Sequence, residues 1–180
     1  MSERKGTKMR LFTAIGINEG IKEGLGAAVA QLKEMGISAN YTKLANMHLT
    51  LCFIGETKTP TKASDAMDEI FQDPFTLELS YLFMLRKGLM AVGFQPSNEL
   101  LNLHSNLSAA LEDKGFSIEK RAFSAHLTIA RNVPAEVSGA DLRAISLPKE
   151  KILVDRFSLM LSERKKGGVA YTPLYTRYLA

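Results

Sequence analysis

Two histidines of this chain are each followed by a threonine two positions later, in a four-residue pattern that occurs twice: His48-Leu49-Thr50-Leu51 and His126-Leu127-Thr128-Ile129. Alternate side chains of a strand share a face, so each motif offers an imidazole and a hydroxyl on one face and two apolar anchors on the other. A chance recurrence of this pattern within matching structural units is expected in on the order of one chain in many thousands. The repetition therefore predicts a functional pair rather than two packed histidines.

A pair of histidines is suited to moving protons near neutral pH. Imidazole has an unperturbed pKa near 6.5, so one ring can be neutral and remove a proton from water while the other is charged and protonates a departing oxygen. The hydroxyls of Thr50 and Thr128 can donate hydrogen bonds to oxygens on which negative charge develops. This combination suits the opening of a strained cyclic phosphodiester without a metal or another cofactor.

The third histidine and the single cysteine do not form a second candidate site. His104 falls in a helical pattern without a threonine partner, and we expect it on the helix surface or flank. The single cysteine, Cys52, has no partner for an intramolecular disulfide and is expected to fill space in a strand. Three histidines and one cysteine form no cluster at zinc spacing, so no metal site is expected.

The elements that must position the motifs follow from hydrophobic periodicity, caps and turn residues. The sequence predicts, in order, a strand over 10–17, a helix over 19–35, a strand over 47–54, a helix over 60–71, a hairpin of strands 75–85 and 89–94, a helix over 96–114, a strand over 123–131, an irregular or helical segment over 134–147, and a second hairpin of strands 152–161 and 169–178 around the turn residues 163–168.

This order contains an internal repeat: a motif strand, a helical connection and a hairpin occur once in each half, with the two histidines 78 residues apart (126 − 48). We therefore expect an α+β fold with two pseudo-symmetric lobes, whose antiparallel sheets face a central cleft and whose helices lie outside. No stretch rich in Gly, Pro or Ser divides the lobes, so residues 1–180 are expected to form one bilobal domain, with motif strands near 47–54 and 123–131.

Composition places the chain among ordinary folded domains. Its 180 residues are 46% hydrophobic and 23% charged, which suits one compact domain. The start is charged and no apolar run approaches the roughly 20 residues that span a bilayer, so we expect a cytoplasmic monomer that needs neither a membrane nor an obligatory protein partner. A net charge of +4 and a pI near 9.2 mildly favour an anionic partner, either a phosphorylated metabolite or a nucleic acid.

The chain resembles the two-histidine phosphoesterase superfamily, specifically its RNA 2',3'-cyclic phosphodiesterase branch, historically called 2'-5' RNA ligase. Besides the two motifs, the resemblance rests on Arg10-Leu11-Phe12-Thr13-Ala14-Ile15, Cys52-Phe53-Ile54-Gly55-Glu56, Ala130-Arg131 and Tyr171-Thr172-Pro173-Leu174. It implies a bilobal α+β fold, a metal-independent reaction, His48 and His126 as the catalytic pair, and Thr50 and Thr128 as phosphate-binding residues. It also favours His126 as the base and His48 as the acid.

The resemblance suggests four further substrate-binding residues, three of which have a structural alternative. Arg131 corresponds to an arginine of the family, but strict alternation points it away from His126, and a structural ion pair is equally consistent. Phe12 and Tyr171 border the cleft or belong to the core. Tyr41 stands where the family often has an aromatic and basic segment, so it is a candidate for base stacking.

Two other features accompany the second motif and its counterpart. Ser124-Ala125 precede His126, where the family usually has a proline. Lys43 and Arg121 each lie five residues before a motif histidine, where they either supply positive charge at the cleft rim or are simply solvated.

The expected activity is hydrolysis of an RNA-terminal 2',3'-cyclic phosphate to a 2'-phosphate, and the same groups would serve the reverse joining of ends through a 2'-5' linkage. One alternative is a module of the same fold that binds a nucleotide or RNA without turnover. Another is a phosphodiesterase for small cyclic phosphates. Both motif histidines are present, which favours an enzyme.

Overall fold

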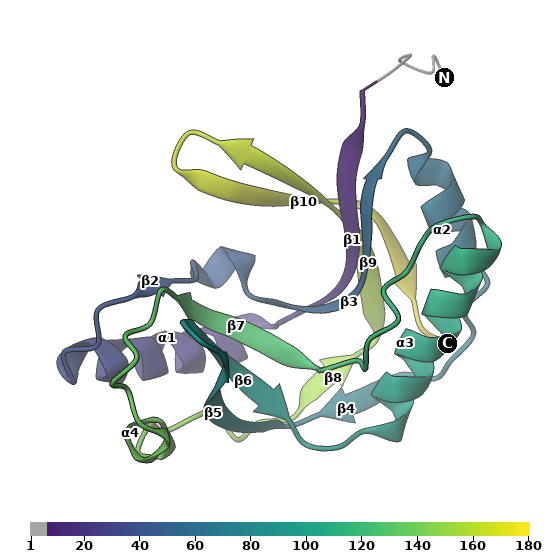
Figure 1. Cartoon of the computed structure of the whole chain (residues 1–180). Helices are drawn as coiled ribbons and strands as arrows, with labels where there is room; N and C mark the ends of the chain where they lie inside the picture. The colour runs from purple at the N-terminus through teal and green to yellow at the C-terminus, as the bar shows by residue number, and fades with distance from the viewer. Residues whose placement is uncertain (1–6) are drawn as a thin grey trace.

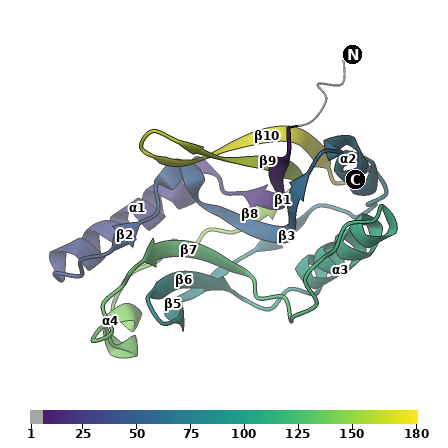
Figure 2. The same ribbon diagram turned by 45° about the horizontal axis from the view of Figure 1, so that its top comes forward.

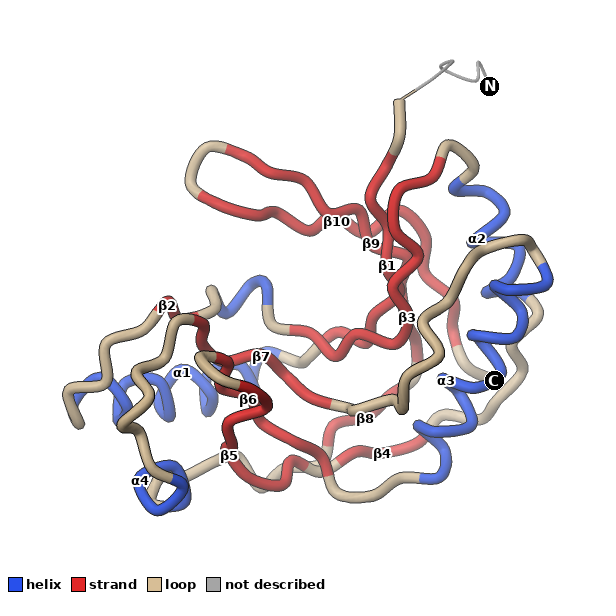
Figure 3. The backbone as a smooth tube through the Cα atoms, viewed as in Figure 1, coloured by secondary structure: helices blue, strands red, loops and turns tan. Residues whose placement is uncertain are grey.

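The computed structural model describes residues 7–180 and places most strands in one antiparallel sheet (Figures 1 and 3). The strand order is β10-β9-β1-β3-β7-β6-β5, with β2 added beside β7. The bounds are β1 (Met9–Gly16), β2 (Asn40–Tyr41), β3 (His48–Thr57), β5 (Leu79–Arg86), β6 (Leu89–Phe94), β7 (His126–Arg131), β9 (Arg156–Lys165) and β10 (Gly168–Tyr178). β4 (Phe75–Leu77) and β8 (Ile152–Val154) pair with each other in a separate small sheet.

The large sheet consists of two halves that meet at a single residue pair. β3 and β7 are joined only through Leu49 and Leu127, whereas β1 pairs with β3 over eight positions. The first half (β10, β9, β1 and β3) and the second half (β7, β6, β5 and β2) diverge from this junction (Figure 1). The predicted α+β fold with antiparallel sheets is confirmed.

The helices cover the faces of these halves that carry the apolar side chains. α1 (Glu19–Glu34) is capped by the side chain of Asn18, and α3 (Asn98–Asp113) is capped by Ser97. α2 (Pro60–Asp68) packs against α3 beside the first half, and the short α4 (Gly139–Arg143) lies next to β5 of the second half (Figures 1 and 2). Each capping side chain satisfies a backbone N–H of the first turn, which would otherwise lack a partner.

Neither half of the sheet comes from one contiguous half of the chain. The C-terminal hairpin β9–β10 pairs with β1, near the N-terminus, while the middle hairpin β5–β6 pairs with β7. The helix α3 follows β6 in sequence, yet Ser108 on α3 contacts Cys52 on β3. The two sequence repeats have therefore exchanged their hairpins, and the motif strands lie at the exchange point.

The structure corrects several expected boundaries. The helix expected over 60–71 ends at Asp68, the strand expected over 123–131 begins at His126, and the segment 134–147 contains α4. The expected strands 75–85 and 152–161 are each interrupted, because their first residues form the separate β4–β8 sheet. The second hairpin has a shorter turn than residues 163–168, since its strands pair as far as Lys165 and Gly168.

Within residues 7–180, no helix has the length and apolar character needed to cross a membrane.

Candidate active site

Both motif strands show the predicted alternation of buried and accessible side chains. Leu49 is 1% exposed and Leu127 is fully buried, whereas the histidine and threonine on either side of each leucine are half-buried. The leucines anchor the strands in the core beneath the sheet. The two imidazoles and two hydroxyls consequently share its opposite face, which we call the site face.

The Leu49–Leu127 pair brings the two motifs together with approximate two-fold symmetry. Continuing this antiparallel register places His48 across from Thr128 and Thr50 across from His126. In such a register, diagonal neighbours are separated by about 7 to 8 Å. Four groups able to donate or accept protons thus surround one position above the junction of the two half-sheets.

Both imidazoles are oriented by a backbone carbonyl two residues earlier. Nδ1 of His48 lies 2.7 Å from the carbonyl oxygen of Asn46, and Nδ1 of His126 lies 2.7 Å from that of Ser124. A carbonyl can only accept, so Nδ1 carries the hydrogen in both rings and Nε2 is the atom available for proton transfer. Nε2 of His48 is 3.0 Å from the hydroxyl oxygen of Thr50.

The surroundings of His48 favour its neutral form. Burial lowers the pKa of this imidazole because charging it there loses hydration, and the positive charge of His126 lowers the pKa further. The hydrogen bond to Asn46 acts in the opposite direction but is outweighed. These effects favour the neutral ring, in which Nε2 accepts the hydroxyl hydrogen of Thr50.

A bulge at the last residue of each motif turns a further side chain toward the site face. Leu51 of β3 has no partner on β1, as is also true of Ile54 farther along the strand, and Ile129 of β7 has no partner on β6. An extra residue in one strand reverses the alternation beyond it. Arg131 and Phe53 consequently lie on the site face, and the expectation that Arg131 points away from His126 is wrong.

Phe12 and Tyr171 surround His48. The ring centroid of His48 lies 5.0 Å from that of Phe12 and 5.0 Å from that of Tyr171, whose edge meets the imidazole at an interplanar angle of 83°. Phe12 is only 4% exposed and packs against the imidazole of His48. Phe53, which contacts Phe12, is 58% exposed. The structure therefore brings Phe12 and Tyr171 to the first motif.

Tyr41 is not brought to the histidines. It pairs with Ala130, a fully buried residue on the core side of β7, and its hydroxyl donates to the carbonyl of Ile37 over 2.8 Å. Lys33 lies over its ring, 5.4 Å from the centroid. These contacts place Tyr41 on the face opposite His126, so the geometry does not support its stacking on a base.

The two cations five residues before the histidines differ in their surroundings. Arg121 is exposed and pairs with Glu119 over 2.8 Å. Lys43 instead donates from Nζ to the carbonyl of Gly167, at the tip of the β9–β10 hairpin, over 3.0 Å. Only Lys43 is held in place by a distant part of the chain.

His104 and Cys52 lie on the far side of the sheet from the motif hydroxyls. Cys52 is 3% exposed and burial raises the pKa of its thiol, as expected for a residue that fills space. His104 stacks on Phe123 with ring centroids 4.0 Å apart. Phe123 itself lies three residues before the first residue of β7, His126.

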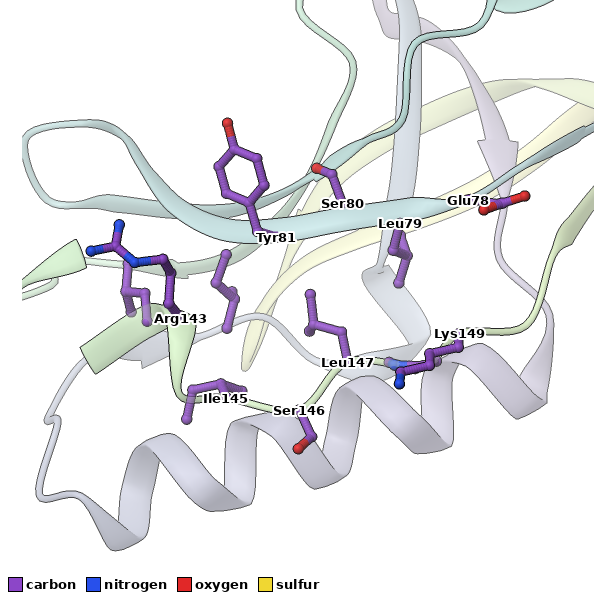
Figure 4. Close-up of a pocket in the computed structure, with 12 residues that line it drawn as sticks. Glu78, Leu79, Ser80, Tyr81, Arg143, Ile145, Ser146, Leu147 and Lys149 are labelled. Atoms are coloured by element: carbon purple, nitrogen blue, oxygen red, sulfur yellow. The ribbon is translucent and has the colours of Figure 1, made fainter. Parts of the chain in front are cut away.

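One well-defined hollow of the structure lies away from the motif residues. A hollow of about 470 Å³ between β5 and the segment after α4 contains none of the motif residues (Figure 4). Among residues 7–180, no group of three or more His, Cys, Asp or Glu side chains is arranged to hold a metal ion.

Comparison with known protein families gives a match: the family model of the 2'-5' RNA ligase superfamily matches residues 22–166. The chain belongs to this superfamily. Both motif histidines lie inside the matched range, and the resemblance inferred from the repeated motif is confirmed.

Similar proteins match the chain over most of its length. An RNA 2',3'-cyclic phosphodiesterase of Thermotoga maritima is 29% identical over 178 residues, covering 93% of this chain and 94% of the relative. The crystal structure of Escherichia coli LigT in its apo form has a TM-score of 0.84 at 27% identity, covering 97% of this chain and 99% of that one. LigT complexed with 3'-AMP has a TM-score of 0.82, also at 27% identity, and covers 96% and 99% of the two chains.

Sequence reasoning missed two parts of this superfamily member's site. The carbonyls of Asn46 and Ser124 orient the imidazoles, but backbone groups leave no signature in residue types. Phe53 was not singled out because alternation assigns it to the core face. Two consecutive buried apolar residues in each motif strand, Leu51-Cys52 and Ile129-Ala130, were the available signal of a bulge.

Proposed function

We propose that this protein hydrolyses RNA-terminal 2',3'-cyclic phosphates to 2'-phosphates, with His48 and His126 as its acid and base pair. The observation that carries the proposal is the pairing of Leu49 with Leu127, which puts two imidazoles and two hydroxyls around one point. Relatives named RNA 2',3'-cyclic phosphodiesterase over nearly the full chain support this substrate.

The proposed reaction needs two proton transfers and one displacement at phosphorus. A water oxygen attacks the phosphorus while a neutral imidazole takes one of its protons, and the bond from phosphorus to the 3' oxygen breaks. The charged imidazole gives its proton to that departing oxygen, which leaves the phosphate on the 2' oxygen. If a 5' hydroxyl takes the place of water, the same attack forms a bond between its oxygen and phosphorus, breaks the bond to the 3' oxygen, and joins the two ends through a 2'-5' linkage.

The hydrogen bond between His48 and Thr50 supports His48 as the acid. The hydroxyl of Thr50 has one hydrogen, and a neutral His48 accepts it, so it is not free for a phosphate oxygen. Protonating His48 makes Nε2 a donor and releases the hydroxyl hydrogen to the substrate. A bound phosphate anion also favours imidazolium, so substrate binding restores the proton that burial removes.

The other site-face residues complete the proposed substrate contacts. Thr128 would donate to a second phosphate oxygen beside His126. Arg131 lies two cross-strand positions from Thr128 on the site face, about 7 Å along the strand at about 3.3 Å per residue, which its long side chain can span. Phe12 and Tyr171 would shield His48 from water and fix its ring.

Product analysis tests this proposal directly. An oligonucleotide ending in a 2',3'-cyclic phosphate should yield a 2'-phosphate, identified by its phosphorus-31 NMR signal and its chromatographic mobility against 2'- and 3'-phosphate standards. A 3'-phosphate product would overturn the regiochemistry. Binding without turnover would support the nucleotide-binding module instead.

A further inference from the structure

We propose that the β9–β10 hairpin binds the RNA backbone preceding the cyclic phosphate, with Arg164 and Lys43 as its phosphate-binding cations. This inference rests on the proposed function and adds a subsite to it. The hairpin is defined by residues 162–171, and it lies outside the acid and base pair.

The hairpin bends away from its own sheet and toward the first motif. β9 pairs with β1 only between Ser158 and Leu161, and its remaining residues pair with β10 alone. Two side chains then hold its tip against the segment before His48. Asn46 donates from Nδ2 to the carbonyl of Val169 over 3.0 Å, and Lys43 donates to that of Gly167. Figure 1 shows the hairpin extending over the side of the molecule where β2 lies.

Regular pairing determines which hairpin side chains are directed to the site face. Tyr171 pairs with Ser162 and Val169 pairs with Arg164, without a register shift between them. Because Tyr171 contacts His48, the alternate residues Val169 and Arg164 belong to the same face. Arg164 therefore lies on the site face, about two residues, or roughly 7 Å, beyond the row of Tyr171.

Lys166 lies in the turn of the hairpin, and the three charged residues of its strands are divided between its two faces. Glu163 and Lys165 lie on the outer face, where their charged groups are 3.7 Å apart and compensate each other. Arg164 is exposed, and no carboxylate among residues 7–180 lies within ion-pair distance of it. Within the two strands, the cation that has no carboxylate partner is therefore the one on the site face.

Lys43 adds a second cation that is fixed in position. One of the three N–H groups of its ammonium donates to the Gly167 carbonyl. The other two can bind an anion beside the hairpin tip. Single-stranded nucleic acid is bound by such cations along its phosphates, with little dependence on base sequence. A strand whose last phosphate lies between His48 and His126 would pass Arg164 and Lys43 with its preceding phosphates.

The matched variants Arg164→Glu and Lys165→Glu test the inference, because they change the net charge equally at adjacent positions on opposite faces. The substrates are an octanucleotide ending in a 2',3'-cyclic phosphate and a 2',3'-cyclic mononucleotide. We expect Arg164→Glu to lower kcat/KM for the octanucleotide at least tenfold through KM, as for loss of a hydrogen bond to a charged group. The mononucleotide should be cleaved at an unchanged rate, and Lys165→Glu should alter both substrates less than twofold.

Salt dependence provides an independent measurement. For the octanucleotide, the slope of log kcat/KM against log salt concentration should become shallower by about 0.7 in Arg164→Gln, as one phosphate contact is lost. Equal losses in Arg164→Glu and Lys165→Glu, or equal losses on both substrates, would overturn the hairpin subsite. The hairpin subsite would also be overturned if the wild-type enzyme cleaved the mononucleotide as efficiently as the octanucleotide. That result would leave the proposed chemistry intact. Failure to cleave either substrate would instead refute the proposed function.

Discussion

Phe53 and Arg131 occupy equivalent positions in the two motif strands, each five residues after its histidine and each turned onto the site face by a bulge. The bulged residues, Leu51 and Ile129, are themselves the last residues of the two motifs. The two-fold relation of the motifs thus extends to their bulges, but one position carries an aromatic ring and the other a guanidinium. The first motif is therefore lined by rings, while the second carries a positive charge.

This asymmetry predicts that Arg131 binds phosphate. Arg131→Gln should raise KM roughly tenfold or more, because a charge-assisted hydrogen bond is worth about 1.5 to 3 kcal/mol. Arg131→Lys should recover only part of the loss, since an ammonium cannot contact phosphate in bidentate fashion. Arg121→Gln is the matched control, because that exposed arginine already pairs with Glu119. Unchanged kinetics in Arg131→Gln would remove this residue from the site.

Removal of either motif imidazole should abolish most turnover. His48→Ala and His126→Ala should each reduce kcat about 10² to 10⁴-fold, the usual contribution of a positioned acid or base. His104→Gln serves as the control because His104 stacks on Phe123, away from the site face. Circular dichroism should show that all three variants are folded. Near-normal turnover in a folded His48→Ala or His126→Ala would refute the pair.

A substrate whose leaving group needs no protonation distinguishes acid from base. With a nitrophenyl phosphodiester, the variant lacking the acid should regain much of its rate, whereas the variant lacking the base should not. We expect the recovery in His48→Ala. Recovery in His126→Ala instead would reverse the two roles without affecting the rest of the site.

The threonine hydroxyls should contribute less than the imidazoles. Thr50→Val and Thr128→Val keep the side-chain shape but lose one hydrogen bond to a charged oxygen, which should cost about 1.5 to 3 kcal/mol in kcat/KM. Thr50→Ser and Thr128→Ser retain the hydroxyl and should stay near the wild-type rate. If the serine variants were as slow as the valine variants, the threonines would act through packing rather than through hydrogen bonding.

The pH dependence should reveal the neutral state of His48. Its lowered pKa means that the ring loses its proton at a lower pH than an ordinary histidine, so the limb of kcat/KM that reports His48 in the free enzyme should lie below 6.5. Bound phosphate favours imidazolium, so the corresponding limb of kcat should lie at higher pH. Both profiles should be bell-shaped, and each limb belongs to the coupled pair. If the limbs of kcat and kcat/KM fell at the same pH, substrate binding would not raise the pKa of His48.

Proton transfer between two imidazoles requires no metal, so turnover should survive exhaustive chelation. Dialysis against EDTA, followed by assay with and without added Mg²⁺, Mn²⁺ or Zn²⁺, is the measurement. A rate that disappears on chelation and returns with one ion would replace the imidazole base with metal-activated water.

The repeated His-apolar-Thr-apolar motif let the sequence alone predict the fold class, the family and the accessible face of each motif strand. The family followed from the resemblance of the motifs, whereas the faces and helices depend on local periodicity: a period of two fixes the face of His48 and of Thr50, and apolar spacing with caps fixes α1 and α3. The Leu49–Leu127 contact itself was not predictable from either strand, although the repeat suggested that the two motifs meet.

Only the tertiary structure decided the exchange of the hairpins and the direction of Arg131. Local patterns mark a hairpin but not the strand it pairs with, because β9 can satisfy its backbone groups beside any free sheet edge. A bulge arises from the fit between two strands, as between β7 and β6, and reverses alternation without changing residue types. For the same reason, the sequence placed Tyr41 near a base, whereas pairing with Ala130 turned it into the core.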